Sequence, residues 1–314
     1  MDSENQTKVT EFILLGISNR TEMELTLFAV FLPVYLITLS ANTLIIMAVL
    51  VDQHLHNPMY FFLCNLSFLD ICYSSTSLPI PLKNFLKERK TISFSGCVAQ
   101  MYISLSLGVV ECFLLVIMAC DRYIAICHPL NYTIIMTWPV CMKTAISAWI
   151  TGFLLSVVSV VFTIKLPFCG HNRINHLVCE VGAVVRLACT DIHLNELLGF
   201  VSSIIVLVVP LSVIIFTYVQ IIVAILKISS TDGRFKAFST CTSHLTVVAL
   251  FYGTAMVGYL RPRSMVSAQK DKIISLVYGV FTPMLNPLIY TLRNNDMKGA
   301  LKKSVRGRVL SLHK

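Results

Sequence analysis

The strongest constraint on the fold of this chain is a set of seven long segments that are almost free of charged residues. They are residues 25–51, 58–82, 91–120, 144–164, 197–226, 237–260 and 273–292. Only Asp70, in the second, and Glu111, in the third, interrupt them. Each segment reaches the roughly 20 residues with which an α-helix crosses a bilayer. The sequence therefore predicts an all-α membrane protein, a bundle of seven transmembrane helices.

Composition supports a bilayer as the solvent. The chain is 56% hydrophobic and only 13% charged, whereas soluble domains contain about 25% charged residues. A net charge of +9 would suggest nucleic acid as the partner of a soluble protein. In a membrane protein it is interpreted loop by loop, because Lys and Arg collect on the cytoplasmic side. We expect the lipid bilayer as a partner and no nucleic acid.

Charge at the two ends predicts the orientation and three parts of the chain. Residues 1–24 contain five acidic and two basic side chains, whereas residues 293–314 contain seven basic and one acidic. This asymmetry places the N-terminus outside the cell. Basic residues in the loops at 83–90 and 261–272 weaken the signal. We expect an extracellular segment (1–24), a seven-helix domain (25–292) and a cytoplasmic basic tail (293–314) that begins with a short amphipathic helix.

Two acceptor motifs for N-glycosylation agree with this orientation. Asn5 and Asn19 each stand two residues before a threonine on the expected extracellular side. Asn65 and Asn131 also match the motif, but the topology buries the first and places the second inside the cell. We expect modification only at Asn5 and Asn19.

Four of the eleven cysteines fall on the oxidising, extracellular side. They are Cys97, Cys169, Cys179 and Cys189. An even number there predicts two disulfides, with three possible connectivities. We favour Cys97–Cys179 and Cys169–Cys189, because the first would tie the long loop between the fourth and fifth helices over the bundle.

A metal site is the alternative use of one of these cysteines. His176, Cys179 and Glu180 lie within five residues, and imidazole, thiolate and carboxylate groups suit a soft metal such as copper. An oxidised sulfur is a poor ligand, so we favour the disulfide. We expect no metal and no cofactor.

Two carboxyl groups are predicted at similar depth in the membrane. Asp70 lies twelve residues after Pro58, about 18 Å along its helix, and Glu111 precedes Arg122 by eleven residues, about 16 Å. Two such acids can share a sodium ion or hold protons. The alternative is that they are neutral and hydrogen-bonded, with Asn42 and Asn286 as partners.

A second group of polar residues lies near the cytoplasmic ends of three helices. Asp121 and Arg122 close the third segment, where a charge costs roughly 2.5–3.5 kcal/mol unless it is partnered or hydrated. Pro287 kinks the last helix, and Asn286 can satisfy a carbonyl that the kink frees. We expect a moving switch in which Tyr218 and Tyr290 approach Arg122; a static kink is the alternative.

These motifs resemble those of rhodopsin-like G-protein-coupled receptors. The strings that carry the resemblance are Asp121-Arg122-Tyr123 and Asn286-Pro287-Leu288-Ile289-Tyr290. Longer strings at 55–60, 118–130, 236–245 and 283–294 are similar to those of the olfactory (odorant) receptor family, across essentially the whole chain. The strings at 187–189 and 251–254 resemble its tetrapod, or class II, branch.

Helical spacing, combined with this resemblance, predicts a ligand pocket in the extracellular half of the bundle. Its candidate residues are Met101, Ser104, Leu105, Gly108, Cys112, Ser202, Ser203, Val206, Tyr252, Ala255, Met256, Tyr259, Leu276 and Gly279. Tyr252 and Tyr259 are favoured, since a buried phenol needs a partner. The alternative for each residue is ordinary packing between helices. The mainly apolar lining predicts a small hydrophobic ligand.

The resemblance implies an odorant receptor in the plasma membrane, and in sensory cilia if the receptor is olfactory. Its partners would be a small volatile odorant and a stimulatory olfactory G protein that raises cyclic AMP. Lys236 and His244 would then lie near the opening that admits the G protein, and Arg122 would be released from Asp121 on activation.

Three other classes of membrane protein are alternatives. A transporter normally shows repeated halves or a charged pore, and the chain has no internal repeat. A membrane enzyme needs a nucleophile beside a base, but Ser243 and His244 are adjacent and point to different faces of a helix. A rhodopsin-like receptor for a non-odorant small molecule is the nearest alternative.

Overall fold

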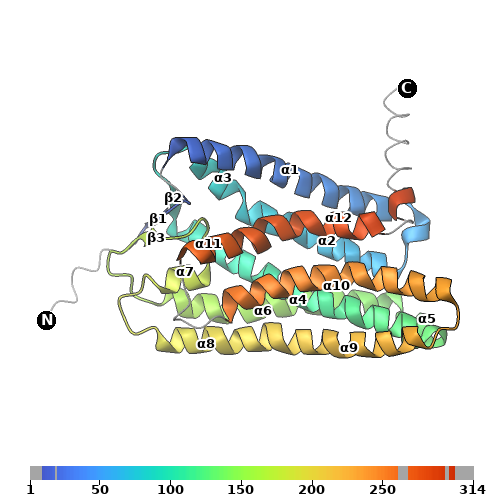
Figure 1. Ribbon diagram of the computed structural model, residues 1–314. Helices are drawn as coiled ribbons and strands as arrows, with labels where there is room; N and C mark the ends of the chain where they lie inside the picture. The colour runs from blue at the N-terminus through green and yellow to red at the C-terminus, as the bar shows by residue number, and fades with distance from the viewer. Residues whose placement is uncertain (1–8, 18–19, 261–267, 294–296, 301–314) are drawn as a thin grey trace, which may run out of the picture.

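The computed structural model describes residues 9–17, 20–260, 268–293 and 297–300. Long helices run side by side along one axis (Figure 1). Five are single elements: α1 (Thr21–Val51), α2 (Pro58–Ser77), α4 (Phe94–Cys127), α6 (Trp138–Ile164) and α10 (Thr231–Tyr259). Two are composite: α8 (His193–Ser203) continues through the π-helical turn η3 (Ile204–Val208) into α9 (Val209–Leu226), and α11 (Ala268–Leu276) continues through the π-helical turn η5 (Val277–Phe281) into α12 (Thr282–Arg293).

These seven units confirm the predicted bundle. Six of them are long and apolar enough to cross a membrane by length and composition. The seventh is α2, which carries Asp70. The central helix is α4, which packs against α2, α6 and α9. Its end at Cys127 lies seven residues beyond the predicted end at 120, so Asp121 and Arg122 belong to a continuous helix.

The second segment is divided, contrary to the single helix predicted over 58–82. It begins as expected, with Pro58 in the first turn and the Asn57 side chain accepting a hydrogen bond from the Tyr60 amide at 3.3 Å. It ends at Ser77, and the short helix α3 (Pro79–Phe85) follows. Pro79 and Pro81 have no amide hydrogen, so the helical hydrogen bonds are interrupted where α2 ends and α3 begins.

A lid covers the end of the bundle at which the disulfides lie. Strand β1 (Glu11–Leu14) pairs antiparallel with β2 (Thr91–Ser93) and parallel with β3 (Arg173–Ile174). The disulfides Cys97–Cys179 and Cys169–Cys189 are both formed. Phe12 is buried in the same cluster as Cys97 and Cys179. Because disulfides persist in oxidising compartments, this end is extracellular.

The lid also changes the expectation for the first 24 residues. Part of this segment, β1, is an integral strand of the lid, and α1 begins at Thr21. The Lys90 ammonium donates a hydrogen bond to the Glu24 carboxylate, which joins the first turn of α1 to the chain entering β2. Burial lowers the pKa of Lys90.

Several predictions fall on residues that the structure does not describe. Asn5 and Asn19 lie outside the described residues, as does most of the expected amphipathic helix of the tail. Within the tail, residues 297–300 are helical, and Met297 and Ala300 are buried.

The proline in α12 is compensated from another helix, and not by Asn286 as the sequence suggested. Pro287 has no amide hydrogen, so the carbonyl of Pro283, four residues earlier, loses its helical donor. The Asn42 side-chain amide of α1 donates to this carbonyl at 3.1 Å, and to the Thr38 carbonyl at 3.0 Å. Asn286 instead donates to Asp70. A kink in one helix is therefore stabilised by a polar residue of another.

A double-mutant cycle tests this compensation. Asn42→Ala should lower the free energy of unfolding by about 1 kcal/mol, because it leaves a buried carbonyl unpaired. In a Pro287→Ala background the new amide can serve the Pro283 carbonyl, so Asn42→Ala should then cost clearly less. Thermal unfolding of the four purified receptors in lipid nanodiscs measures the coupling. An equal cost of Asn42→Ala in both backgrounds would contradict it.

Candidate ligand cavity and cytoplasmic switch

A cavity of about 280 Å³ lies among α4, α6, α8, η3 and α10, close to the lower size limit of small-molecule pockets. The helix α4 contributes Ser104, Leu105, Gly108, Val109, Glu111 and Cys112. The other lining residues are Tyr73, Leu155, Ser156, Val158, Ser159, Leu198, Val201, Ser202, Ser203, Ile205, Val206, Leu207, Phe251, Ala255, Tyr259 and Tyr278. The wall is mainly apolar, with a few hydroxyl groups.

Nine of the fourteen residues proposed from the sequence line this cavity. They are Ser104, Leu105, Gly108, Cys112, Ser202, Ser203, Val206, Ala255 and Tyr259. Leu276 and Gly279 line a separate, smaller cavity. Met101, Tyr252 and Met256 line neither cavity. Met101 is buried in the apolar cluster beneath the lid that also contains Phe12, Cys97 and Cys179, which we call the lid cluster.

Tyr252, favoured from the sequence, has a packing role in this structure. Its hydroxyl donates to the Cys112 carbonyl at 3.1 Å, and its ring packs edge-on against Phe251. The partner that a buried phenol needs is thus the backbone of α4. Helical spacing identifies which residues of α10 share a face, but not which of them faces empty space.

The helix α6 also contributes to the cavity wall, which was not predicted from the sequence. Leu155, Ser156, Val158 and Ser159 all line the cavity. Ser156 and Ser159, two small hydroxyl residues three apart, were a possible local signal, but α6 contains other hydroxyl residues as well. The signal is weak, because serine in a membrane helix can bond to its own backbone, as Ser156 does to the Gly152 carbonyl.

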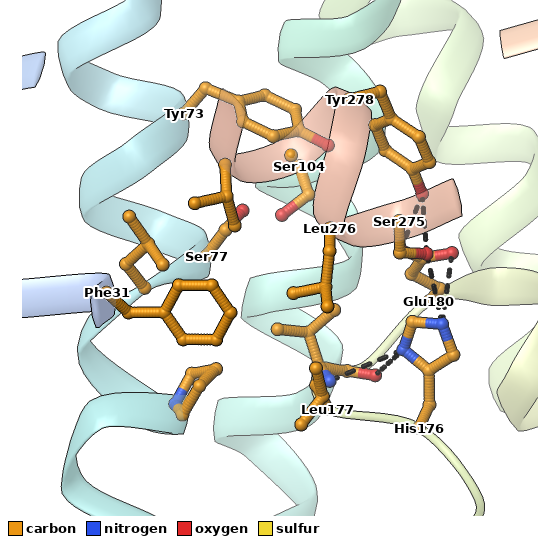
Figure 2. Close-up of a pocket in the computed structure, with 15 residues that line it drawn as sticks. Phe31, Tyr73, Ser77, Ser104, His176, Leu177, Glu180, Ser275, Leu276 and Tyr278 are labelled. Atoms are coloured by element: carbon orange, nitrogen blue, oxygen red, sulfur yellow. Dashed lines mark hydrogen bonds and ion pairs between the residues drawn. The ribbon is translucent and has the colours of Figure 1, made fainter. Parts of the chain in front are cut away.

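A second cavity, of about 30 Å³, lies beneath the extracellular loop and shares Tyr73, Ser104 and Tyr278 with the first. This volume suffices for one or two water molecules. Figure 2 shows His176 and Glu180 of the loop facing Ser275 and Tyr278. Glu180 accepts hydrogen bonds from Ser275 at 2.8 Å and from Tyr278 at 2.5 Å, and the Ser275 hydroxyl is 3.0 Å from His176 Nε2.

The three residues considered above as a metal site, His176, Cys179 and Glu180, have other partners in the structure. Cys179 is in a disulfide, and His176 and Glu180 bind helix residues. Within the described ranges, no group of three His, Cys, Asp or Glu residues is arranged to hold a metal ion.

A buried polar layer lies below the main cavity. The Asn286 amide donates to both oxygens of Asp70, at 3.2 and 3.1 Å. Glu111 is close enough for repulsion if both acids ionise. Its Oε1 atom is buried and has no hydrogen-bond partner in the part of the chain that the structure describes. Glu111 also lines the main cavity, so this layer and the cavity share a wall.

The cytoplasmic arginine contacts α10, not Asp121. Arg122 Nη1 donates to the Thr240 carbonyl at 2.8 Å. The Asp121 carboxylate accepts a hydrogen bond from the Tyr132 hydroxyl at 2.8 Å, and burial together with the Asp121 charge raises the pKa of this phenol. No ion pair joins Asp121 and Arg122 among the described side chains. The pair of Arg122 and Asp121 that the sequence predicted is therefore not formed among the described side chains. Arg122 instead joins α4 to α10.

His244 provides a second contact between the same helices. Its Nε2 is 3.1 Å from the Leu115 carbonyl, and its Nδ1 is 2.8 Å from the Tyr218 hydroxyl. A carbonyl only accepts, so Nε2 carries the hydrogen; in the neutral ring, Nδ1 then accepts from Tyr218. This arrangement joins α4, α9 and α10 at one buried histidine.

The remaining switch residues differ in their contacts. Tyr290 is buried in the same cluster as Tyr218, and its hydroxyl has no hydrogen-bond partner within the described part of the chain. The Tyr123 hydroxyl lies 3.2 Å from His128 Nε2. Lys236 lies in α10, but its side chain is outside the described residues.

Comparison with known proteins identifies the family of this chain. A family model described as olfactory receptor matches residues 31–307. Human olfactory receptor 13C9 is 51% identical over 308 residues, covering 96% of this chain and 97% of its own length. Human olfactory receptor 10A6 is 50% identical, with 99% of each chain covered. The dog olfactory receptor-like protein OLF3 is 48% identical, with 96% of each covered.

The fold and the cytoplasmic motifs define a seven-helix, G-protein-coupled receptor of the plasma membrane. The matches extend over nearly the whole chain, and the chain belongs to the olfactory receptor family. It is a multi-pass membrane receptor and not an enzyme.

Two glycines allow a test of the cavity. A methyl group at Gly108 would have no other atom within 4 Å, whereas at Gly152 it would overlap the Val110 side chain and lie 3.0 Å from the Ser106 carbonyl. Gly152→Ala should therefore destabilise the receptor by about 1–3 kcal/mol. Gly108→Ala should leave it unchanged or stabilise it by up to about 1 kcal/mol. Thermal unfolding in nanodiscs compares them, and an equal loss in both variants would argue against empty space at Gly108.

Proposed function

We propose that this receptor binds a small, mainly hydrophobic volatile molecule in the 280 Å³ cavity and activates a stimulatory olfactory G protein, which raises cyclic AMP. The observation that carries the ligand class is the cavity wall. Its one carboxyl group is Glu111, at the wall shared with the polar layer, and the rest is apolar or hydroxyl-bearing. Such a wall favours apolar ligands, with a few polar groups to orient them.

The proposed mechanism begins at α10. Ala255 and Tyr259 of α10 line the cavity, and Tyr252, His244 and Thr240 of the same helix contact α4. A ligand can shift this helix only if it binds the shifted state more tightly. In that state the cytoplasmic end of α10 lies farther from α4, and Arg122 is free to bind the carboxyl terminus of a G protein.

The choice of G protein rests on membership in the family. Position supports the role of Arg122, because this buried arginine lies near the C-terminal end of α4, whose other end carries the disulfide cysteine Cys97. An arginine guanidinium that loses its backbone partner can bind a carboxylate with paired hydrogen bonds.

We further propose that Asp70 and Glu111 hold a sodium ion or a proton. Both side chains are buried, and Glu111 Oε1 has no partner in the described residues. An uncompensated pair of charges is costly at this depth. A bound cation or proton removes that cost.

Replacement of Arg122 tests the signalling role. Cells that express the receptor are exposed to a panel of volatile alcohols, aldehydes, ketones and esters, and cyclic AMP is measured with surface expression in the same cells. A compound that activates the wild type should give no signal above receptor-free cells with Arg122→Ala, because the side chain that would bind the G protein is missing.

Arg89→Ala is the matched control, since this exposed arginine forms an ion pair with Glu11 at the extracellular surface, far from the switch. It should respond as the wild type does. Retained signalling by Arg122→Ala at normal surface expression contradicts the switch role, and a panel that never raises cyclic AMP contradicts the proposed function.

A further inference from the structure

The wall of the main cavity is partly an outer surface of the bundle. Five of its residues are both lining and exposed, and four of them come from α6, α8 and η3: Leu155 (40%) and Val158 (51%) on α6, Val201 (44%) on α8 and Ile205 (53%) on η3. Each is hydrophobic. They come from two neighbouring helices, spaced three apart on one and four apart on the other, so each pair forms one stripe along its helix.

These four residues lie between the cavity and the outer surface of the bundle. In a membrane-spanning bundle, an exposed hydrophobic side chain on the helix surface contacts lipid acyl chains. A residue that contacts lipid on one side and lines a cavity on the other stands at the boundary between them. We call the boundary formed by Leu155 and Val158 of α6 and by Val201 and Ile205 of α8–η3 the lateral portal.

The portal has an upper boundary and apolar edges. Above it, the Asn195 side-chain amide of α8 donates to the Phe162 carbonyl of α6 at 3.1 Å. The hydroxyl groups of Ser202 and Ser203, next to the portal, both donate to the Gly199 carbonyl, at 2.9 and 2.7 Å. Their hydrogens are thus used within the helix, and a passing molecule meets an apolar path.

The backbone is also irregular at the portal. Ile205 belongs to the π-helical turn η3, and such turns are common at functional sites. A methyl group at Gly199 would have no other atom within 4 Å. The helix surface at Gly199 is therefore open.

Toward the extracellular side, Tyr259 is the one exposed wall residue among those that the structure describes. No residue of 9–17, 86–93 or 165–192 lines the main cavity. Leu105, at the top of the wall, packs against the lid cluster that contains Phe12, Phe168 and Cys179. The strands of the lid gather at that end of the bundle (Figure 1). The fifth exposed wall residue, Tyr259, ends α10, and its hydroxyl is 3.4 Å from that of Tyr278.

We propose that ligands reach the cavity from within the bilayer, through the lateral portal between α6 and α8–η3. The molecules it admits are small apolar compounds that dissolve among the acyl chains. The proposal rests on the proposed function in one respect: the 280 Å³ cavity is taken as the ligand site.

A cysteine in the cavity measures access without any odorant. Gly108→Cys places a thiol in open cavity space. The full-length receptor in phospholipid nanodiscs is treated with N-cyclohexylmaleimide, which partitions into bilayers, or with the impermeant cation methanethiosulfonate-ethyltrimethylammonium. Peptide mass spectrometry measures modification at position 108 separately from modification of the native cysteines, including Cys112, which lines the same cavity. We expect rapid modification by the maleimide and little by the cation.

Portal variants then locate the route. Val158→Trp and Ile205→Trp, each added to Gly108→Cys, should slow the maleimide about tenfold or more, because the indole obstructs the portal; tenfold corresponds to a barrier about 1.4 kcal/mol higher. Leu154→Trp is the matched control, a 64% exposed residue of α6 outside the cavity wall, and should not change the rate. Val158→Ala, which removes bulk from the portal, should speed it. Thermal unfolding confirms that each variant is folded.

Several results would overturn the lateral portal. Modification by the cation as fast as by the maleimide would indicate an aqueous route, and no modification by either reagent would show that the cavity is not reached. Labelling of the Val158→Trp and Ile205→Trp variants at the parental rate, or equal slowing by Leu154→Trp, would show that the route does not pass between these residues. The labelling needs neither odorant nor G protein. If labelling is as expected but no compound of the panel raises cyclic AMP, the proposed function is refuted and the portal is supported. If a compound raises cyclic AMP but labelling fails as described above, the portal is refuted and the proposed function is supported.

Discussion

The structure depends on one constraint: within a bilayer, every buried polar group has to find its partner inside the protein. The consequences reach from one end of the bundle to the other. Asn42 supplies the donor that Pro287 removed from α12. Asn286 supplies donors to Asp70. Such bonds are modest in energy, roughly 1 kcal/mol each, but each joins two particular helices and so specifies their register.

The same constraint explains how the cavity and the switch can communicate. Three hydrogen bonds join α4 to α10 along their length: Tyr252 to the Cys112 carbonyl, His244 to the Leu115 carbonyl and Arg122 to the Thr240 carbonyl. All use a backbone carbonyl as acceptor, so they depend on how closely the helices approach. The cavity lies at one end of this row and the arginine at the other. A ligand that separates the helices at the cavity therefore acts on the whole row.

Much of this arrangement could be predicted from the sequence, and the missing parts share a cause. Apolar length and local strings identify the seven helices, the polar layer and Arg122, because these signals lie within one segment. The partners of those residues could not be found in this way. Asn42 and Pro283 are 241 residues apart, and α6 has no motif to show that Leu155 and Val158 border a cavity. Likewise, Tyr252 and Tyr259 lie on the same predicted face of α10. Only the packing of α10 on α4 shows that Tyr259 lines the cavity and that Tyr252 binds the backbone of α4. The strands of the lid were missed because each has four residues or fewer.

The central claim is that buried hydrogen bonds between α4 and α10 hold the cytoplasmic end of the bundle closed. The most direct measurement is the distance between nitroxide labels on these two helices, at Ala125→Cys and Phe235→Cys, both exposed positions, in a background without other reactive cysteines. In the ligand-free receptor, His244→Phe removes the bonds to Leu115 and Tyr218 and retains an aromatic ring. The account predicts a distance distribution shifted to longer values by this substitution alone. A distribution identical to that of the parent receptor would contradict it.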